Sequence, residues 1–240
     1  TIGDAGAEWE ITGAYRIGNS GTGLVSLFSG ILDANGGINM GVTASGDGTL
    51  VVGDGATNPV VEVSGGNTET ALFGTGKITV NSGTFNQLDN NIIVGQESTS
   101  DATFEVTGGL VDVVNFLRIN HGTGLIDISG GIVNVNTTLD IINETGATSG
   151  IVNVSGGTLN VATNGAVNTG LFVGNVNESG YVAELNVSGS GIVNVTGTGG
   201  NGGLLIGSSG TDSSGSVTLT GGEINVSGTT TEVGEEGNGS

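Results

Sequence analysis

The chain has 240 residues, among them 50 Gly, one Pro and no Cys, and 3 Lys and Arg against 23 Asp and Glu leave a net charge of −20. Nucleic-acid binding and basic-patch adhesion to an anionic membrane are excluded, because both need clustered cationic side chains. Without Cys there are no disulfides, Cys-based zinc sites, iron–sulfur clusters or thiol catalysis, and no apolar run approaches the roughly 18 residues that span a bilayer.

Residues 1–14, which include Trp9, fit the pattern of the remaining chain poorly, and we treat them as an N-terminal lead-in segment to a repeat domain at 15–240. The chain begins with Thr1 rather than Met, and no basic-then-apolar leader precedes it, so we expect a processed product or an excised piece. From residue 15 onward, alternating apolar and polar residues between Gly, Ser, Thr and Asn favour strands and disfavour helices.

One pattern recurs nine times: an alternating run, a small-residue turn ending in Gly, and a second alternating run, as in LIDISGGIVNV. The shortest spacing between copies is about 18 residues, and longer spacings indicate inserted loops. The nine turn glycines are Gly30, Gly48, Gly66, Gly83, Gly109, Gly131, Gly157, Gly191 and Gly222.

A third short apolar piece lies between most copies, such as YRIGN at 15–19, ALFG at 71–74 and LFVG at 171–174. Three strands in about 18 residues are too few for a propeller blade, which needs four strands over about 40 residues. They suit one rung of a solenoid, in which each strand pairs with its equivalent about 4.8 Å away. We therefore predict an all-β, single-chain parallel β-solenoid (β-helix) of about nine to ten rungs of three short strands, ahead of a sandwich or a closed barrel.

Alignment on the turn glycines predicts which residues stack on each face, because successive strand residues point to opposite faces. The predicted inward stack is Leu32, Leu50, Thr68, Phe85, Val111, Val133, Leu159, Val193 and Ile224. One predicted outward ladder is Asp33, Val51, Glu69, Asn86, Asp112, Asn134, Asn160, Asn194 and Asn225. The other is Ser26, Thr43, Glu62, Thr79, Glu105, Asp127, Asn153, Asn186 and Thr218. Both ladders are acidic in the middle and Asn-rich toward the C-terminus.

Stacked carboxylates repel by about 1 kcal/mol per pair in water, and either a solvated face or a bound cation relieves that repulsion. Calcium is the cation that carboxylate and amide oxygens favour. The calcium-roll motif GGxGxDxUx is absent, because GGNGGLLIG at 199–207 lacks its Asp. We therefore assign no metal, cofactor or catalytic site, and loosely bound calcium stays an open alternative.

Catalysis has only weak candidates. His121 is the single His, and no nearby nucleophile motif accompanies it. Glu105, Asp112 and Asp127 are the one carboxylate group with a precedent, since stacked acids cleave glycosidic bonds in some parallel β-helices. Their neighbourhood offers only Arg118 and Phe116 to hold a sugar. The expectation is that the protein is not an enzyme.

Two further features have two interpretations each. The sequons NVS and NVT are glycosylation signals or by-products of the repeat wording VNVSG. Trp9 and Tyr15 pack on the first rung or stack on a sugar. The sequons begin at Asn153, Asn186, Asn194 and Asn225.

The sequence of the repeat resembles the β-strand repeats of bacterial autotransporter passenger domains and related secreted β-solenoid surface proteins. GIVNVSGGTLNV followed by LFVGN, and LLIGSSG followed by GSVTLTGGEINVSG, carry the resemblance, which covers about residues 15–230. It implies export, an extracellular or cell-surface location, and a solenoid stalk or fibre.

The expected function is that of an extracellular structural protein whose rods associate end to end into a filament, sheath or surface layer. Unpaired strand edges at the two ends of a solenoid favour such self-association. The alternative is an adhesin stalk or glycan-binding module excised from a larger chain, with a glycan or cell-surface partner. Recognition loops would then be at 143–150, 174–184, 196–202 and 207–215. Nucleic-acid partners and membrane insertion are not expected.

Overall fold

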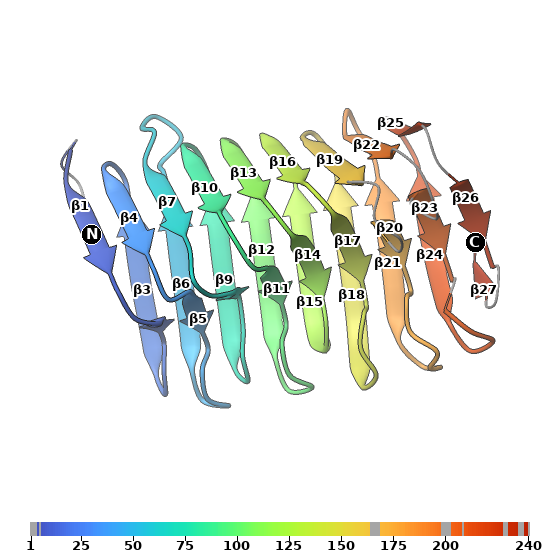
Figure 1. The fold of residues 1–240 in the computed structure, drawn as a ribbon, viewed down its shortest axis with the longest axis horizontal. Helices are drawn as coiled ribbons and strands as arrows, with labels where there is room; N and C mark the ends of the chain where they lie inside the picture. The colour runs from blue at the N-terminus through green and yellow to red at the C-terminus, as the bar shows by residue number, and fades with distance from the viewer. Residues whose placement is uncertain are drawn as a thin grey trace.

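The computed structural model describes residue 4 and the ranges 6–163, 169–197, 203–207, 209–227, 230–234 and 238–239. Over these residues the chain is all-β, without helix, and the predicted parallel β-solenoid with three short strands per rung is confirmed. In Figure 1 the rungs lie side by side, with the N-terminal strands at one end of the stack and the C-terminal strands at the other.

The strands form three nine-stranded parallel sheets, which we name A, B and C in the order in which a rung visits them. Sheet A contains β3 (Thr22–Leu27), β6 (Asp47–Val52), β9 (Thr75–Val80), β12 (Asp101–Val106), β15 (Gly122–Ile128), β18 (Ala147–Val154), β21 (Val182–Val187), β24 (Ser214–Leu219) and β27 (Asn238–Gly239). Sheet B contains β1 (Glu8–Ile11), β4 (Ile31–Ala34), β7 (Val60–Val63), β10 (Thr84–Gln87), β13 (Leu110–Val113), β16 (Ile132–Val135), β19 (Thr158–Thr163), β22 (Ile192–Gly197) and β25 (Glu223–Ser227). Sheet C contains β2 (Tyr15–Ile17), β5 (Ile38–Met40), β8 (Thr68–Glu69), β11 (Ile92–Val94), β14 (Phe116–Ile119), β17 (Thr138–Ile141), β20 (Gly170–Val173), β23 (Gly203–Ile206) and β26 (Thr230–Val233).

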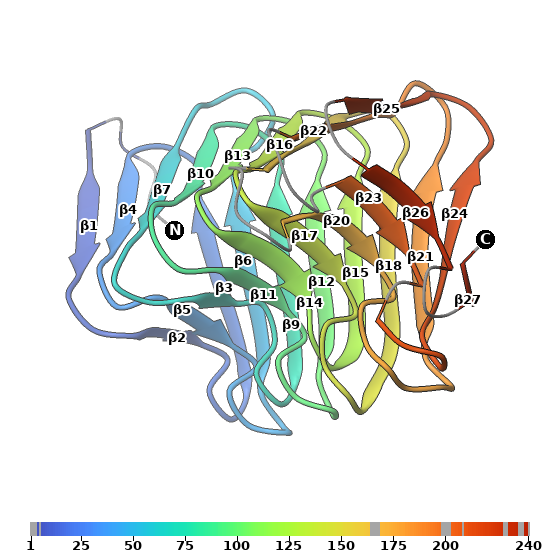
Figure 2. The ribbon, with the colours of Figure 1, turned by 45° about the vertical axis from the view of Figure 1, so that its right-hand side comes forward.

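The chain makes about eight complete turns from β3 to β26, preceded by β1 and β2 and followed by β27. Figure 2 shows the three sheets as separate faces around one interior. The segment 1–14 contains β1, which pairs in parallel register with β4. The first strand of sheet B therefore lies within the segment 1–14, which was predicted to precede the repeat domain.

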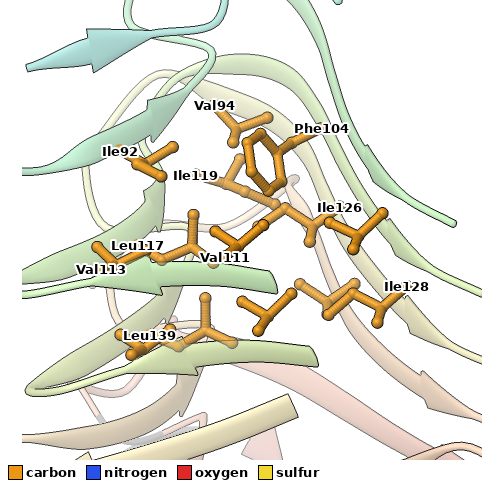
Figure 3. Packing of buried hydrophobic residues seen from close by; sticks show 14 of the residues in the cluster. Ile92, Val94, Phe104, Val111, Val113, Leu117, Ile119, Ile126, Ile128 and Leu139 are labelled. Carbon is orange, nitrogen blue, oxygen red and sulfur yellow. The ribbon is translucent and has the colours of Figure 1, made fainter. Parts of the chain in front are cut away.

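Alternation along each strand builds the core, because inward residues are mostly apolar, whereas outward positions hold both polar and apolar residues. In β13, Val111 and Val113 are fully buried, whereas the alternate residues Leu110 and Asp112 are partly exposed. Figure 3 shows the inward side chains from the three sheets meeting in the middle of the rung. Large residues are few, and Phe85 packs edge to face on the Phe104 ring of the next rung, with centroids 6.2 Å apart. The core is thin but continuous along the rod.

The predicted inward stack is right at seven positions and wrong at two. In sheet B, Val61 lies between Leu32 and Phe85. Leu50 is an inward residue of sheet A, and Thr68 is an inward residue of sheet C. The stack observed in sheet B is Trp9, Leu32, Val61, Phe85, Val111, Val133, Leu159, Val193 and Ile224.

The error arises at Gly48, which resembles a turn glycine but lies inside β6. Its partners in the neighbouring strands are Gly23 and Gly76, so small residues stack here on the inner side of sheet A. A Cβ at Gly48 would be 2.4 Å from the Ile17 carbonyl oxygen and 2.8 Å from the Met40 Cβ. Glycine is needed here because the incoming sheet C strand crosses close to the backbone, not because the chain turns.

Two other details of the repeat differ from the prediction. The segment ALFG at 71–74, which was predicted to be a third strand, is a connection. The third strand of that rung is β8, which precedes it. The shortest separation between stacked residues is 22 positions, from Asp112 to Asn134, rather than about 18. The shorter value came from treating Gly48 and Gly66 as the turns of separate rungs. Both belong to one rung, whose A-to-B connection is the long segment 53–59.

Candidate functional site

The outer face of sheet B carries one of the polar ladders. Val51 and Glu69 do not belong to it, and Glu62 takes the place between Asp33 and Asn86. The observed ladder is Glu10, Asp33, Glu62, Asn86, Asp112, Asn134, Asn160, Asn194 and Asn225. Its acidic part therefore lies toward the N-terminal end of the rod, not in the middle.

Asparagine amides in the C-terminal half of this ladder form a continuous hydrogen-bonded chain. Asn134 Nδ2 donates to Asp112 Oδ1 at 2.6 Å, and Asn160 Nδ2 donates to Asn134 Oδ1 at 2.8 Å. Asn194 repeats the contact to Asn160 at 2.8 Å, and Asn225 repeats it to Asn194 at 3.0 Å. Every donor points toward the N-terminal end, and such chains polarise one another. In this ladder, the amides of the two sequon residues Asn194 and Asn225 are engaged within the fold.

The outer face of sheet A carries the second ladder. Neither Thr43 nor Glu62 belongs to it: Thr43 lies in the connection between β5 and β6, and Glu62 lies in sheet B. The observed ladder is Ser26, Val51, Thr79, Glu105, Asp127, Asn153, Asn186 and Thr218. Here the acidic residues do lie in the middle, and the Asn residues follow them.

The three candidate carboxylates do not form one group. Glu105 and Asp127 are neighbours in sheet A, whereas Asp112 lies on the outer face of sheet B. Lys77 Nζ lies 2.7 Å from Glu105 Oε2, and this hydrogen bond lowers the pKa of Glu105. Burial raises the pKa of Asp127, and the adjacent charge of Glu105 raises it further. Lys77 therefore offsets part of the repulsion between Glu105 and Asp127. The ion pair between Lys77 and Glu105 was not predicted from the sequence.

His121 contacts the loops of the two neighbouring rungs. Its Nδ1 lies 2.8 Å from the backbone oxygen of Gln96, and its Nε2 lies 3.6 Å from Glu144 Oε2. Asn120 Nδ2 also donates to Glu144 Oε1, at 3.3 Å. The single His thus ties together the turns of three successive rungs, and it has no nucleophile among these contacts.

A charged pair on the outer face of sheet C was missed from the sequence. Asp140 is only 4% exposed and is the register neighbour of Arg118. Burial raises the pKa of Asp140 to about 6, although the Arg118 charge and a hydrogen bond from Asn175 lower it. The Arg118 guanidinium carbon lies 4.4 Å from the centre of the Phe116 ring. The alternation in β17 points Asp140 outward, but nothing in the pattern LDI signals that an outward residue is buried.

Loops at the corner between sheets C and A form a hydrogen-bonded ridge. Gly146 N donates to Glu178 Oε2 at 2.6 Å, and Asp212 N donates to Asn177 Oδ1 at 3.2 Å. Each loop is thereby fastened to the loop of the next rung. The ridge comprises the described residues of the predicted loops 143–150, 174–184 and 207–215, whereas most of 196–202 falls outside the described residues.

Other site chemistry is sparse. In the described ranges, no three His, Asp or Glu side chains are grouped so that they could hold a metal ion. Within the same part of the chain, no helix is long and apolar enough to cross a bilayer. A cavity of about 380 Å³ lies under the 53–59 connection, and none of its lining residues is titratable. They are Gly6, Ser29, Gly30, Ile31, Thr57, Asn58 and Val60.

Each end of the stack exposes part of the core cross-section, although Ile17 and Leu27 in the first strands of sheets C and A are buried. Trp9 is 41% exposed, although Leu32, its neighbour in the same inward stack, is fully buried. At the other end, Val233 is 57% exposed, whereas Ile206 beneath it is 5% exposed. Trp9 also packs edge to face on Tyr15, with ring centroids 5.2 Å apart. These end faces are the largest departures from the burial pattern of the repeat.

Searches against protein-family models, curated proteins and solved structures found no match to this chain.

Proposed function

We propose that the chain is a non-enzymatic, extracellular structural protein whose rods associate end to end into a filament, sheath or surface layer. The parallel β-solenoid supports a scaffold role, because its outer faces carry ladders that repeat from rung to rung. The likeness of the repeat wording to autotransporter passenger domains supports export to the cell surface. The net charge of −20 on each chain favours repulsion between the sides of neighbouring rods, which leaves the ends as the sites of association.

The observation that carries this proposal is the exposure of inward-facing residues at both ends. Val233 and Trp9 occupy positions that are buried in every intermediate rung of their stacks, and both are strongly exposed. Ile11 at one end, and Ile224 and Val226 at the other, are only partly buried although they pack on the core. Within the described residues, β1 and β26 each pair on one side only. Apolar surface next to unpaired backbone groups favours addition of another strand.

A concentration series in sedimentation velocity tests the proposal. The 240-residue chain is expected to show an average mass that rises with concentration. Val233→Lys places a charge at an end face and should block the growth. Val182→Lys is the matched control, because Val182 is 43% exposed on the side of the rod in β21. A chain that stays monomeric over the whole series, or equal effects of the two variants, would refute end-to-end association.

The corner ridge favours a second candidate, an adhesin stalk or glycan-binding module from a larger secreted chain. Insertions on one face of a solenoid commonly carry recognition, and here the loops support one another through Glu178 and Asn177. A glycan array probed with the chain should then give hits that Asn177→Ala weakens. An array without hits would remove this candidate and leave the structural proposal unaffected.

A further inference from the structure

The register of sheet C leads to opposite charges at the two ends of the rod. One outward column runs unbroken through all nine strands of this sheet. It begins with Arg16 at one end and finishes with Glu232 at the other. The complete column is Arg16, Asn39, Glu69, Ile93, Arg118, Asp140, Phe172, Leu205 and Glu232.

A cation at this position is notable because the chain has only 3 Lys and Arg. Arg16 is exposed on β2, the first strand of sheet C. Glu232 is half-buried on β26, the last strand of the sheet. If one rod continues another with its strands in parallel register, these two residues become neighbours in the same column.

We infer that copies of this chain join head to tail, with β26 of one copy pairing in parallel with β2 of the next, so that Glu232 faces Arg16 of the next copy. The inference rests on the proposed function, because it specifies the contact through which end-to-end association occurs. The occupant of each end face is therefore the opposite end of a second copy.

The same alignment continues sheet B through β25 and the next copy's β1. Ile224 then lies beside the next copy's Trp9, and Val226 beside its Ile11, so two inward apolar stacks run on across the junction. In the outward column between them, Asn225 faces Glu10 of the next copy. The Asn225 amide nitrogen already donates to Asn194 within its own copy, so this column supplies no hydrogen bond across the junction.

One contact opposes the junction, because Glu223 faces Glu8 of the next copy in the remaining outward column. This like-charge pair costs about 1 kcal/mol in water and is screened by salt. Contact between two N-terminal ends would be worse, since it brings Glu8 and Glu10 of both copies together without supplying a partner for Arg16. The pattern of charges thus favours head-to-tail contact over contact between like ends.

Cysteine pairs test the register directly, because the chain has no Cys of its own. Glu8→Cys with Glu223→Cys in one chain places the two Cys residues at matching positions of strands about 4.8 Å apart, which is within disulfide reach, and also removes the repulsive pair. Mild oxidation should convert it into a ladder of disulfide-linked oligomers on a non-reducing gel. Glu10→Cys with Glu223→Cys is the matched control. It also removes two carboxylates, but a shift of two residues adds about 6.6 Å along the strand and exceeds disulfide reach.

Charge reversal tests the ion pair. Arg16→Glu and Glu232→Arg should each raise the concentration needed for polymerisation about tenfold, and both changes in one chain should largely restore it. Lys77→Glu and Asp101→Arg make the same charge changes on the side of the rod and should have much smaller effects. Polymers that cross-link equally through both cysteine pairs, or that ignore Arg16→Glu, would overturn this register while leaving end-to-end association intact. An unmodified chain that forms no polymer would overturn both.

Discussion

Replacing Asp140 by Asn should stabilise the fold at neutral pH. Burial raises the Asp140 pKa from its ordinary value of 3.8 to about 6, in spite of the opposing effects of Arg118 and Asn175. A displacement of about two units, at about 1.4 kcal/mol each, makes the ionised side chain cost the folded state on the order of 3 kcal/mol. Because the folded-state pKa is raised, the stability is fully present below about pH 4 and is lost as the pH rises through about 6.

Guanidinium unfolding followed by circular dichroism measures this difference. Asp140→Asn is expected to raise the free energy of unfolding by about 2–3 kcal/mol at pH 8 and to change it little at pH 3.5, where the wild-type carboxyl is also neutral. The Asn retains an oxygen that accepts the Asn175 hydrogen bond. Asp101→Asn, at an exposed position in β12, is the control for removing one charge from an acidic chain. A gain that is equal at both pH values, or a loss at pH 8, would refute the reasoning.

Three further predictions concern packing and the ladders, and thermal or denaturant unfolding measures each. Phe85→Ala should cost about 3–5 kcal/mol, because Phe85 is fully buried and its loss leaves a cavity beside Phe104; a cost below 1 kcal/mol would show that the thin core collapses freely. Gly124→Val should destabilise by at least about 1–3 kcal/mol, since a Cβ there lies 2.4 Å from Ile119 Cγ2 and 2.9 Å from the Val94 oxygen; a neutral result would contradict the close approach of sheets C and A. Asn160→Ala should cost about twice as much as Asn225→Ala, roughly 2 against 1 kcal/mol, because Asn160 makes two ladder hydrogen bonds and Asn225 makes one; equal costs would mean that the ladder is not a hydrogen-bonded chain.

Local alternation was enough to predict the fold. A two-residue period with β-branched residues fixes which side chains face inward, and self-similar wording requires rungs that stack on one another. These signals placed Val111, Val133 and Asn160 in their columns. They failed between residues 43 and 69, where the long 53–59 connection and the in-strand Gly48 imitate an extra rung. The sequence alone does not distinguish a glycine that permits close approach of two backbones from a glycine that forms a turn.

The ends and the outer faces were predictable only in part. Open strand edges follow from any solenoid, and the structure adds the exposed Val233 and Trp9 that make those edges apolar. The Lys77 contact to Glu105 requires the register between β9 and β12, which depends on the lengths of the intervening loops. Asp140 has Arg118 and Phe172 as its register neighbours in sheet C and accepts a hydrogen bond from Asn175, and alternation carries no information about these neighbours.

Electron cryo-microscopy of the purified chain above its polymerisation concentration tests end-to-end association most directly. Nine strands per sheet at about 4.8 Å each predict filaments with an axial repeat of about 43 Å per copy and strands perpendicular to the filament axis. Isolated rods at every concentration, or filaments in which rods contact one another through their sides, would contradict the account.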